Sequence, residues 1–388
     1  MQELAIAFFN GISIGSVLLL AALGLSITFG LMGVINLAHG ELMMLGAYAT
    51  FVVQNMFRPL GEPLFNFYIF LAIPVAFIVA ALVGLLLERG VIRYLYGRPL
   101  ETLLATWGVS LILRQFVRSV NWQMVIGLGL FSLLFFGGLF FVKRRQDWEK
   151  IRKWARAVLL VLSIGISTTA SILMGNLAGQ VLTRPWFSAR NVDVTAPAWL
   201  RGGFALGNFQ VPYARVFIII LGLVCLGLIY LFLNRSNWGL RIRSVTQNRQ
   251  MSACLGIPTD QVDALTFAMG SGLAGVAGCA ITLLGSVGPN TGQNYIVDTF
   301  MVVVVGGVGN LLGTVLAALA IGSLIYFIGS GTLAVLLSPV DVLQPVVDVL
   351  NFFATTSMSK VLVFVLIIAF LQIKPAGIFP PKGRTAEL

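Results

Sequence analysis

The 388-residue sequence predicts an all-α polytopic membrane protein with about 10 transmembrane segments, some of them broken or re-entrant. Two features of the composition support this class: 58% of the residues are hydrophobic and only 10% are charged. A soluble globular domain carries roughly 25% charged residues, so this chain has too little polar material to cover a water-facing surface of its size. A third feature is the arrangement of apolar residues in runs of about 20, the length that spans a bilayer as a helix.

Apolar runs that could cross the membrane recur along the whole chain. A spanning segment must bond its backbone polar groups internally, which a helix does. The clear runs are 4–30, 66–87, 102–120, 124–142, 157–177, 216–233, 262–284, 311–328 and 361–373. Two further runs, 31–57 and 299–309, are apolar but glycine-rich or short. No Lys or Arg precedes Arg58, so we expect the first helix to remain in the mature protein.

Most of the 25 Lys and Arg residues fall into four segments, and cytoplasmic loops hold the excess of such residues. The clusters lie within 89–98, 143–156, 235–249 and 374–384. Placing all four in the cytoplasm is consistent with the crossings between them if the N-terminus is outside and the C-terminus is cytoplasmic. The formal net charge of +11 is therefore interpreted as membrane topology, and no nucleic-acid partner is expected.

Two regions are expected to contain interrupted helices. The connection 30–40 holds no Lys or Arg, although it should be cytoplasmic, so it suggests a tucked or re-entrant segment. The stretch 298–329 must cross twice to keep the basic clusters on one side, and it should break near Gly306, Gly307 and Gly309, next to Asn310. Interrupted helices in corresponding halves of a chain indicate a transport pathway. Close packing of helices through small residues is the other explanation, and it fits the remaining glycines of the apolar runs at least as well: Gly15, Gly24, Gly270, Gly272, Gly275 and Gly278.

The sequence shows no catalytic or metal-binding constellation. The chain has a single His and three Cys residues, which excludes a His-rich metal site and gives no zinc spacing. The segment 307–314 resembles a phosphate-binding loop only superficially, since it lacks the lysine and lies in an apolar run. We therefore expect no cofactor bound by this chain. If ATP drives the protein, another chain binds it.

A polar cluster interrupts the apolar sequence at Asn36, His39 and Glu41. Polar side chains within a membrane span are costly and mark a pathway for solute by default. A structural explanation is also open: Asn36 and Glu41 could cap the broken helix ends, and His39 could bond a freed carbonyl. Both interpretations place the cluster inside the protein.

The run 102–120 carries a stripe of hydroxyl groups. Thr102, Thr106 and Ser110 are spaced at i, i+4 and i+8, which places them on one face of a helix. Such a stripe suits a small, polar, uncharged substrate. Ordinary hydrogen bonding between helices produces the same pattern.

The sequence of the cytoplasmic stretch 241–260 predicts a short amphipathic helix that ends at Gly256 and Pro258. A loop that only fixes orientation explains its arginines. It does not explain the small residues and the Gly-Ile-Pro pattern that lead directly into the next crossing.

Together, the segments 33–48 (GVINLAHGELMMLGAY) and 253–260 (ACLGIPTD) closely resemble the branched-chain-amino-acid-type permeases of ATP-binding-cassette (ABC) importers. Further matches resemble the urea-importer permeases within that family. They are 103–115 (LLATWGVSLILRQ), 191–203 (NVDVTAPAWLRGG), 282–289 (TLLGSVGP), 292–298 (GQNYIVD) and 370–380 (FLQIKPAGIFP). The resemblance covers nearly the whole chain except about 120–186.

The stretch 120–186 departs from the family pattern, in which the chain passes almost directly from residues 117–119 to the 191–203 segment. Here two more crossings enclose a loop with seven basic residues within 143–156. We interpret this stretch as an inserted transmembrane hairpin with a basic cytoplasmic loop. The hairpin leaves and returns on the same side, so the family layout is preserved. Its loop could touch anionic lipid headgroups, at about 1 kcal/mol per nearby Lys or Arg.

The resemblance implies one transmembrane permease domain, 1–388, in the bacterial inner membrane. Implied partners are a second related permease, two ABC ATPase subunits that bind ATP and Mg²⁺, and an extracytoplasmic substrate-binding protein. It also implies that the loop 234–261 contains the coupling element that docks on an ATPase. The matching positions are Arg249, Met251, Ala253, Gly256, Pro258 and Asp260. On this basis the expected substrate is urea.

Other functions remain open at the level of sequence. A branched-chain amino acid is the alternative substrate within the family, although a zwitterion should need fixed charges or helix termini along its path. A stand-alone channel or ion-coupled carrier is the alternative mechanism, with Glu41 as its main intramembrane carboxylate. A membrane-embedded enzyme is disfavoured by the missing catalytic groups.

Overall fold

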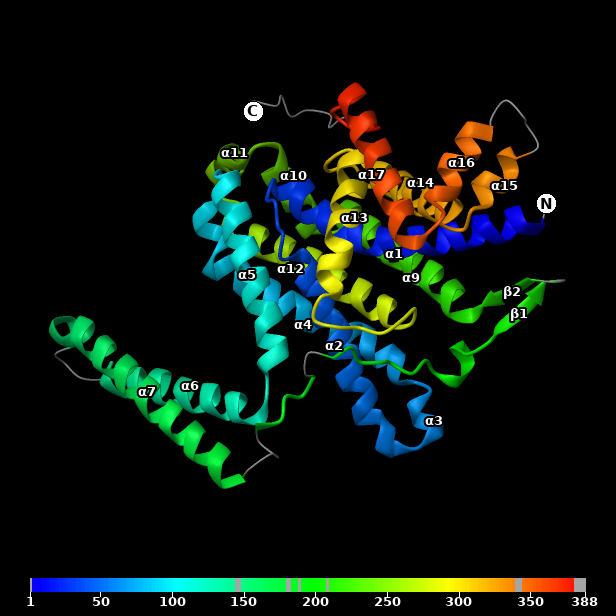
Figure 1. Cartoon of the computed structure of the whole chain (residues 1–388). Helices are drawn as coiled ribbons and strands as arrows, with labels where there is room; N and C mark the ends of the chain where they lie inside the picture. Colours follow the sequence, from blue (N-terminus) through cyan, green and yellow to red (C-terminus); the bar gives the residue numbers. More distant parts are fainter. Residues whose placement is uncertain are drawn as a thin grey trace. The chain divides into compact units, whose positions relative to one another are not determined.

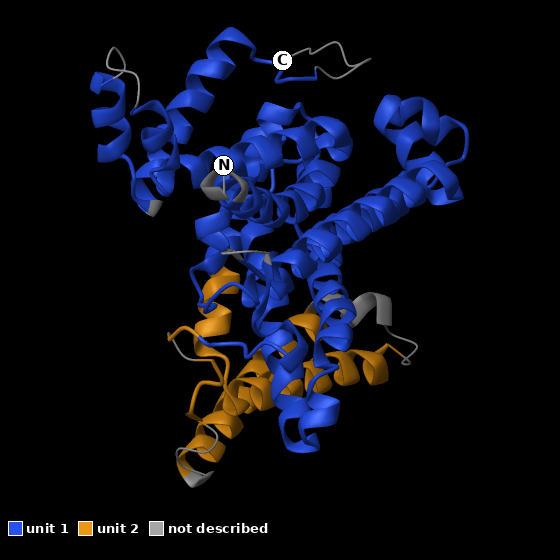
Figure 2. Ribbon diagram, turned by 90° about the vertical axis from the view of Figure 1, so that its right-hand side faces the viewer, with its two compact units in different colours: residues 1–111, 192–388 blue, residues 112–191 orange. Residues whose placement is uncertain are grey.

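The computed structural model describes residues 2–143, 148–178, 183–187, 190–206, 209–338 and 344–379. It is almost entirely helical (Figure 1). The chain divides into two compact units, residues 1–111 with 192–388 and residues 112–191, which Figure 2 distinguishes by colour. Helix α5 (Pro99–Ser119) begins in the first unit and ends in the second.

The centre of the first unit is a bundle of long helices that pack on α12 (Thr259–Thr282). Its neighbours are α1 (Gln2–Met32), α2 (His39–Phe57) and α4 (Tyr68–Gly90). Helix α14 (Leu311–Gly329) packs along α1. Residues 270–282 of α12 are buried on every side, as expected for the helix at the centre of a membrane bundle.

Glycine allows these helices to approach closely. A Cβ atom on Gly24 of α1 or Gly278 of α12 would collide with the backbone of the facing helix, at Gly270 and Met43 respectively. Gly15 likewise meets the backbone of α14 at Ala318. Small residues at such contacts let the backbones pack without intervening side chains. The sequence-based explanation of these glycines by close packing is therefore confirmed.

The remaining helices of the first unit lie around this bundle. They are α9 (Tyr213–Arg235), α13 (Thr291–Gly306), α15 (Thr332–Leu337), α16 (Gln344–Phe352) and α17 (Thr356–Ile373), with short helices η1 (Arg58–Leu60), α3 (Glu62–Phe65), η2 (Ile92–Leu95) and η3 (Ala198–Leu200) in the connections. A single antiparallel hairpin, β1 (Gly203–Leu206) with β2 (Phe209–Pro212), is the sheet of the described residues. This hairpin was not predicted, because its alternation is short and lies in a connection.

The second unit contains helices α6 (Trp122–Val142) and α7 (Trp148–Ala178), which pack on one another. Asn121 caps α6 by accepting a hydrogen bond from the Met124 N–H at 2.7 Å. Ser171 of α7 donates to the Gln123 carbonyl oxygen at 3.0 Å, and Gly127 faces Ser171. Residues 144–147 of the basic loop, together with the basic residues Lys382 and Arg384, lie outside the described residues.

Each of the apolar runs proposed from the sequence contains a helix. Among the described residues, seven helices are long and apolar enough to cross a membrane: those within α1, α4, α6, α7, α9, α12 and α14. The bent pair α16–α17 is an eighth candidate, at an angle of 120°. Helices α2, α5 and α13 are shorter or more polar. The all-α polytopic class is confirmed, while the orientation with the N-terminus outside stays a prediction.

Two predicted runs differ from the helices observed. The run 31–57 is not one helix: α1 extends to Met32, and α2 begins only at His39. The run 299–309 belongs to a helix that begins earlier, at Thr291. Gly292 there packs against the backbone of Gly40, so the polar residues 291–298 lie against α2 instead of forming a loop.

Candidate functional site

The first break lies between α1 and α2 and carries the predicted polar cluster. Gly33 has φ +69°, a conformation that glycine adopts without strain, and the backbone leaves the helix there. Asn36 Oδ1 accepts a hydrogen bond from the Ala38 N–H at 3.0 Å and so forms the turn before α2. His39 Nε2 lies 3.0 Å from the Ala21 carbonyl oxygen in α1. Asn36, His39 and Glu41 are all at most 1% exposed.

The hydroxyl stripe of α5 lies against this break. Thr106 Oγ1 accepts a hydrogen bond from the Leu37 N–H at 3.2 Å, and Ser110 Oγ donates to Glu41 at 3.0 Å. Thr102 bonds the Arg98 carbonyl oxygen at 2.8 Å within its own helix. The structure thus brings Thr106 and Ser110 together with the polar cluster and leaves Thr102 one turn away. These contacts match ordinary interhelical hydrogen bonding.

Asn36 retains an unused hydrogen-bond donor. Its side chain is fully buried, and Nδ2 makes no hydrogen bond to any described group. A narrow pocket borders this amide and is too small to hold a water molecule. Its lining consists of Asn36, Ala38, Leu87, Val91, Ile92, Thr106 and Val109. Among the described residues, there is therefore no opening beside Asn36 that is wide enough for a solute.

The second break separates α13 from α14 at the predicted glycines. Gly307 and Gly309 have φ of +100° and +85°, and Asn310 caps α14 by accepting from the Gly313 N–H at 3.2 Å. Gly306 is the last residue of α13. The two breaks adjoin each other, since a Cβ on Gly309 would lie 3.2 Å from the Gly30 carbonyl oxygen near the end of α1.

The C-terminal segment closes over the second break. The Ile378 N–H donates to the Val305 carbonyl oxygen at 2.8 Å, and the Phe379 N–H donates to the Gly306 oxygen at 3.4 Å. These two carbonyls lie at the C-terminal end of α13, where a helix leaves its acceptors unsatisfied. We call residues 374–379 the C-terminal strap. Its contact with α13 was not predicted from the sequence.

The predicted coupling element forms two helices instead of one. Helix α10 (Asn237–Gln247) is followed by α11 (Arg249–Cys254), because Asn248 adopts an extended conformation and caps α11 at the Met251 N–H, 2.9 Å away. Gly256 has φ +82° and turns the chain towards Pro258 and α12. The six predicted coupling positions, Arg249, Met251, Ala253, Gly256, Pro258 and Asp260, are all exposed.

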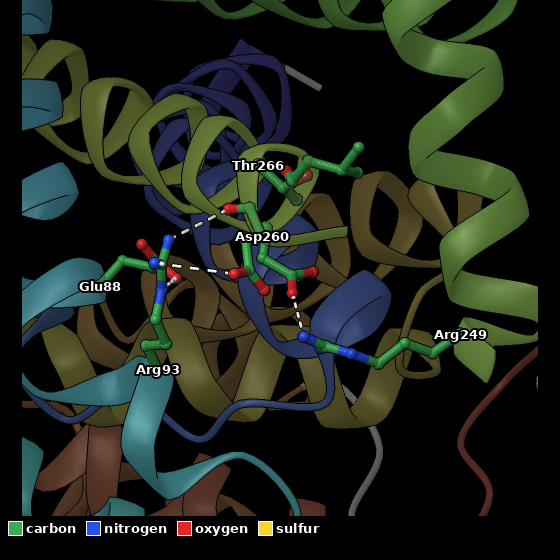
Figure 3. A network of polar contacts seen from close by, with 7 residues as sticks. Glu88, Arg93, Arg249, Asp260 and Thr266 are labelled. Atoms are coloured by element: carbon green, nitrogen blue, oxygen red, sulfur yellow. Dashed lines mark hydrogen bonds and ion pairs between the residues drawn. The ribbon is translucent and has the colours of Figure 1, made fainter. Parts of the chain in front are cut away.

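A network of charges surrounds the start of α12 (Figure 3). Arg249 Nη2 lies 2.6 Å from Asp263 Oδ2, and its guanidinium stacks 4.7 Å from the centre of the Tyr96 ring. Arg93 lies 3.5 Å from Glu88 and 3.8 Å from Asp260. Burial, followed by the carboxylates of Asp263 and Glu88, holds the pKa of Tyr96 well above its ordinary value, so this hydroxyl stays protonated.

Sequence reasoning identified Arg249 and Asp260 in this network but missed Glu88, Tyr96 and Asp263. A faint signal was present: Asp263 follows Asp260 by three residues at the start of an apolar run, and Glu88 ends another such run. Carboxylates inside membrane spans are expensive and require a partner. A second missed pair joins Lys360 of α17 to Asp298 of α13 at 2.6 Å.

The sequence model of the family described as "Branched-chain amino acid transport system / permease component" matches residues 7–371. The chain belongs to this family. The permease is thus a subunit of an ABC-type transport system and a multi-pass protein of the bacterial inner membrane. No solved structure matches it significantly.

Named relatives cover most of the permease. The high-affinity branched-chain amino acid permease LivH of Escherichia coli (strain K12) is 25% identical over 320 residues, 81% of this chain and 82% of LivH. BraD of Pseudomonas aeruginosa, named for the same kind of transport system, is 24% identical over 315 residues with the same coverage. The fructose import permease FruF of Bifidobacterium longum is 29% identical over 178 residues, 43% of this chain and 47% of FruF.

Proposed function

We propose that the permease forms the membrane path for urea in an ATP-driven importer. The observation that carries this proposal is the buried Asn36 amide, whose Nδ2 donor is unused and borders a pocket that is closed in this structure and must widen to admit urea. Urea offers a carbonyl acceptor for such a donor and N–H donors for hydroxyl and carbonyl oxygens. The described lining of that pocket includes an amide, a hydroxyl and aliphatic side chains, and none of its residues is charged.

The proposed assembly contains partners that supply energy and substrate. A second, homologous permease would complete the membrane core. Two ABC ATPase subunits would bind ATP and Mg²⁺ and dock on the exposed residues of α11 and its C-cap, among them Met251 at 58% and Leu255 at 75% exposure. An extracytoplasmic binding protein would deliver the substrate. We propose that this chain itself binds no cofactor and is not an enzyme.

Branched-chain amino acids are the second candidate substrate, because relatives such as LivH and BraD carry that function in their names. An amino acid presents a carboxylate and an ammonium group together, and both lose strong hydration inside a membrane. The described lining of the pocket beside Asn36 offers neither charge a partner. This supports urea over the zwitterion.

Uptake of radiolabelled urea by cells that express the complete transporter tests the substrate. Unlabelled urea should abolish the uptake, and an excess of leucine should leave it unchanged. Uptake of labelled leucine by the same cells, with no uptake of urea, would overturn the urea assignment while preserving the permease family.

The Asn36→Asp variant tests the role of the amide. An ionised aspartate retains the acceptor that bonds the Ala38 N–H, removes the Nδ2 donor and adds a negative charge at a fully buried position. Loss of one hydrogen bond of ~1 kcal/mol should raise the KM for urea by roughly 5-fold or more. Asn121→Asp is the matched control, because Asn121 also uses Oδ1 for its cap but lies at the start of α6. An unchanged KM for urea in Asn36→Asp would show that the Asn36 amide does not contact the substrate.

A further inference from the structure

Arg249, the first residue of the exposed helix α11, uses its side chain to hold another part of the same chain. Its guanidinium forms an ion pair with Asp263, with 2.6 Å between Nη2 and Oδ2, and the Asp263 side chain is only 5% exposed. The same guanidinium stacks on Tyr96. A buried carboxylate needs a partner, so removing Arg249 would leave an uncompensated charge inside the protein. This pair therefore differs from a surface ion pair.

A second group of ion pairs contacts the same end of α12. Arg93 of η2 lies 3.5 Å from Glu88 of α4, whose side chain is fully buried. Arg93 also approaches Asp260, both at its carboxylate, 3.8 Å away, and at its carbonyl oxygen, 3.4 Å away. Figure 3 shows Arg93 and Arg249 approaching the start of α12 from two sides. The charges thus tie α11, α12, η2 and the end of α4 into one group.

Helix α12 continues from this charged end into direct backbone contact with the helices of the first break. Gly270 meets Gly24 of α1, and a Cβ on Gly24 would also lie 2.9 Å from His39 Cε1. Further along, Gly275 meets Ala76 of α4 and Gly278 meets Met43 of α2. Contacts without side chains leave little freedom to absorb a displacement, and close-packed interiors transmit strain.

We propose that Arg249 and Asp263 form a latch that makes α12 follow the movement of α11. An ATPase that displaces α11 would pull α12 through this pair. The glycine contacts would then move α1 and α2, which lie on either side of the break that contains Asn36. Arg249 is therefore a positioning residue that acts through Asp263. This inference rests on the proposed function in one respect, namely that an ATPase docks on α11.

Charge exchange in the assembled transporter tests the latch. Arg249→Asp and Asp263→Arg each place like charges together, and the double variant restores an opposite pair. With complexes reconstituted in liposomes, each single variant should hydrolyse ATP but move at least 10-fold less urea per ATP. The double variant should recover most of this loss. Two results together would overturn the latch: the double variant does not recover transport, and the Arg249→Asp complex has lost its ATPase subunits. They would show that Arg249 contacts the ATPase instead.

The matched control is Arg98→Asp. Arg98 pairs with Glu101 at 3.1 Å on the surface, where both side chains are more than half exposed. The Arg98→Asp substitution removes one Arg–carboxylate pair and leaves the Arg249–Asp263 pair intact. Urea moved per ATP should remain at the parent level. A loss in this control equal to that of Arg249→Asp would overturn the specific role of the latch.

A distance measurement tests the latch independently of the substrate. Cys254 of α11 is exposed, whereas Cys225 and Cys279 are buried, so a spin label can be placed on Cys254. A second label goes on Gly285→Cys just beyond the far end of α12, where a side chain meets nothing within 4 Å. In the otherwise unaltered complex the distance between labels should stay the same when ATP binds. In Asp263→Asn it should change.

The two measurements separate the latch from the proposed function. A label distance that changes on ATP binding in the complex with Arg249 and Asp263 intact would overturn the latch, even if urea uptake is normal. A constant distance that becomes ATP-sensitive in Asp263→Asn supports the latch. That result would stand even if the complex transported leucine and not urea.

Discussion

His39 joins three helices through one buried side chain. It belongs to α2, its Nε2 lies 3.0 Å from the Ala21 carbonyl oxygen of α1, and its ring borders the contact between Gly24 and Gly270 of α12. Sequence reasoning left open whether this residue bonds a freed carbonyl or meets a substrate. The structure places it on a helix carbonyl. Among the described residues, the neighbouring Asn36 Nδ2 and the second ring nitrogen of His39, Nδ1, are both buried without a hydrogen-bond partner.

The close contact beside His39 leads to a prediction at the residue scale. In Gly24→Ala the added methyl group would collide with the Gly270 carbonyl oxygen and approach the imidazole. Overpacking of this kind costs about 1–3 kcal/mol, so the apparent melting temperature of the purified protein in detergent should fall.

Gly227→Ala is the control for this variant. Gly227 lies in α9, and a Cβ there meets nothing within 4 Å. Alanine forms helices better than glycine by about 1 kcal/mol, so this variant should be as stable as the parent or slightly more so. Equal melting temperatures for the two variants would contradict the close approach of α1 and α12.

The helical elements illustrate what the sequence predicts well. Length and apolarity alone identify the spans, because the bilayer demands them. The lack of Lys and Arg in 30–40 predicts the first break, and the glycines at 306–309 predict the second. The contacts between distant segments had no local signal. Thr106 lies 69 residues from Leu37, and nothing in its own helix indicates that it bonds that backbone. The C-terminal strap and Asp263 escaped prediction for the same reason.

The C-terminal strap supports a prediction at the scale of the element. Gly377 has φ +78°, and a Cβ on it would lie 2.6 Å from the Val304 carbonyl oxygen. Gly377→Ala should therefore both strain the backbone, by about 1–2 kcal/mol, and push the strap off α13. Gly202→Ala separates these effects, because Gly202 has φ +88° but no neighbour within 4 Å. Thermal unfolding should show the larger loss in Gly377→Ala; an equal loss would mean that strain alone acts.

The hairpin of α6 and α7 supports a second prediction for an element. No described residue of α6 is buried, and the two helices pack on each other. The sequence resemblance implies that related permeases lack this stretch. Replacing residues 121–190 with a short Gly/Ser linker should therefore leave assembly and urea uptake per transporter close to the parent. A loss of ATPase subunits from the shortened complex, measured by co-purification, would instead give the hairpin a role in assembly.

At the scale of the whole molecule, the proposed pathway and the proposed coupling element belong to one connected set of helices. The two breaks adjoin at Gly30 and Gly309, and α12 connects this region to the exposed helix α11. The described polar groups near the two breaks are mostly neutral and bonded to backbone, which supports the proposal that the chain is a passive conduit. On this proposal, the work of transport comes from partner subunits.

Reconstitution of the purified chain, alone and with its partner subunits, tests this division of labour most directly. Labelled urea uptake and ATP hydrolysis are measured in the same liposomes. We expect neither activity for the chain alone, and ATP-dependent urea uptake when the second permease, the ATPases and the binding protein are all present. Urea uptake by the chain alone, or ATP hydrolysis without the ATPase subunits, would contradict this expectation.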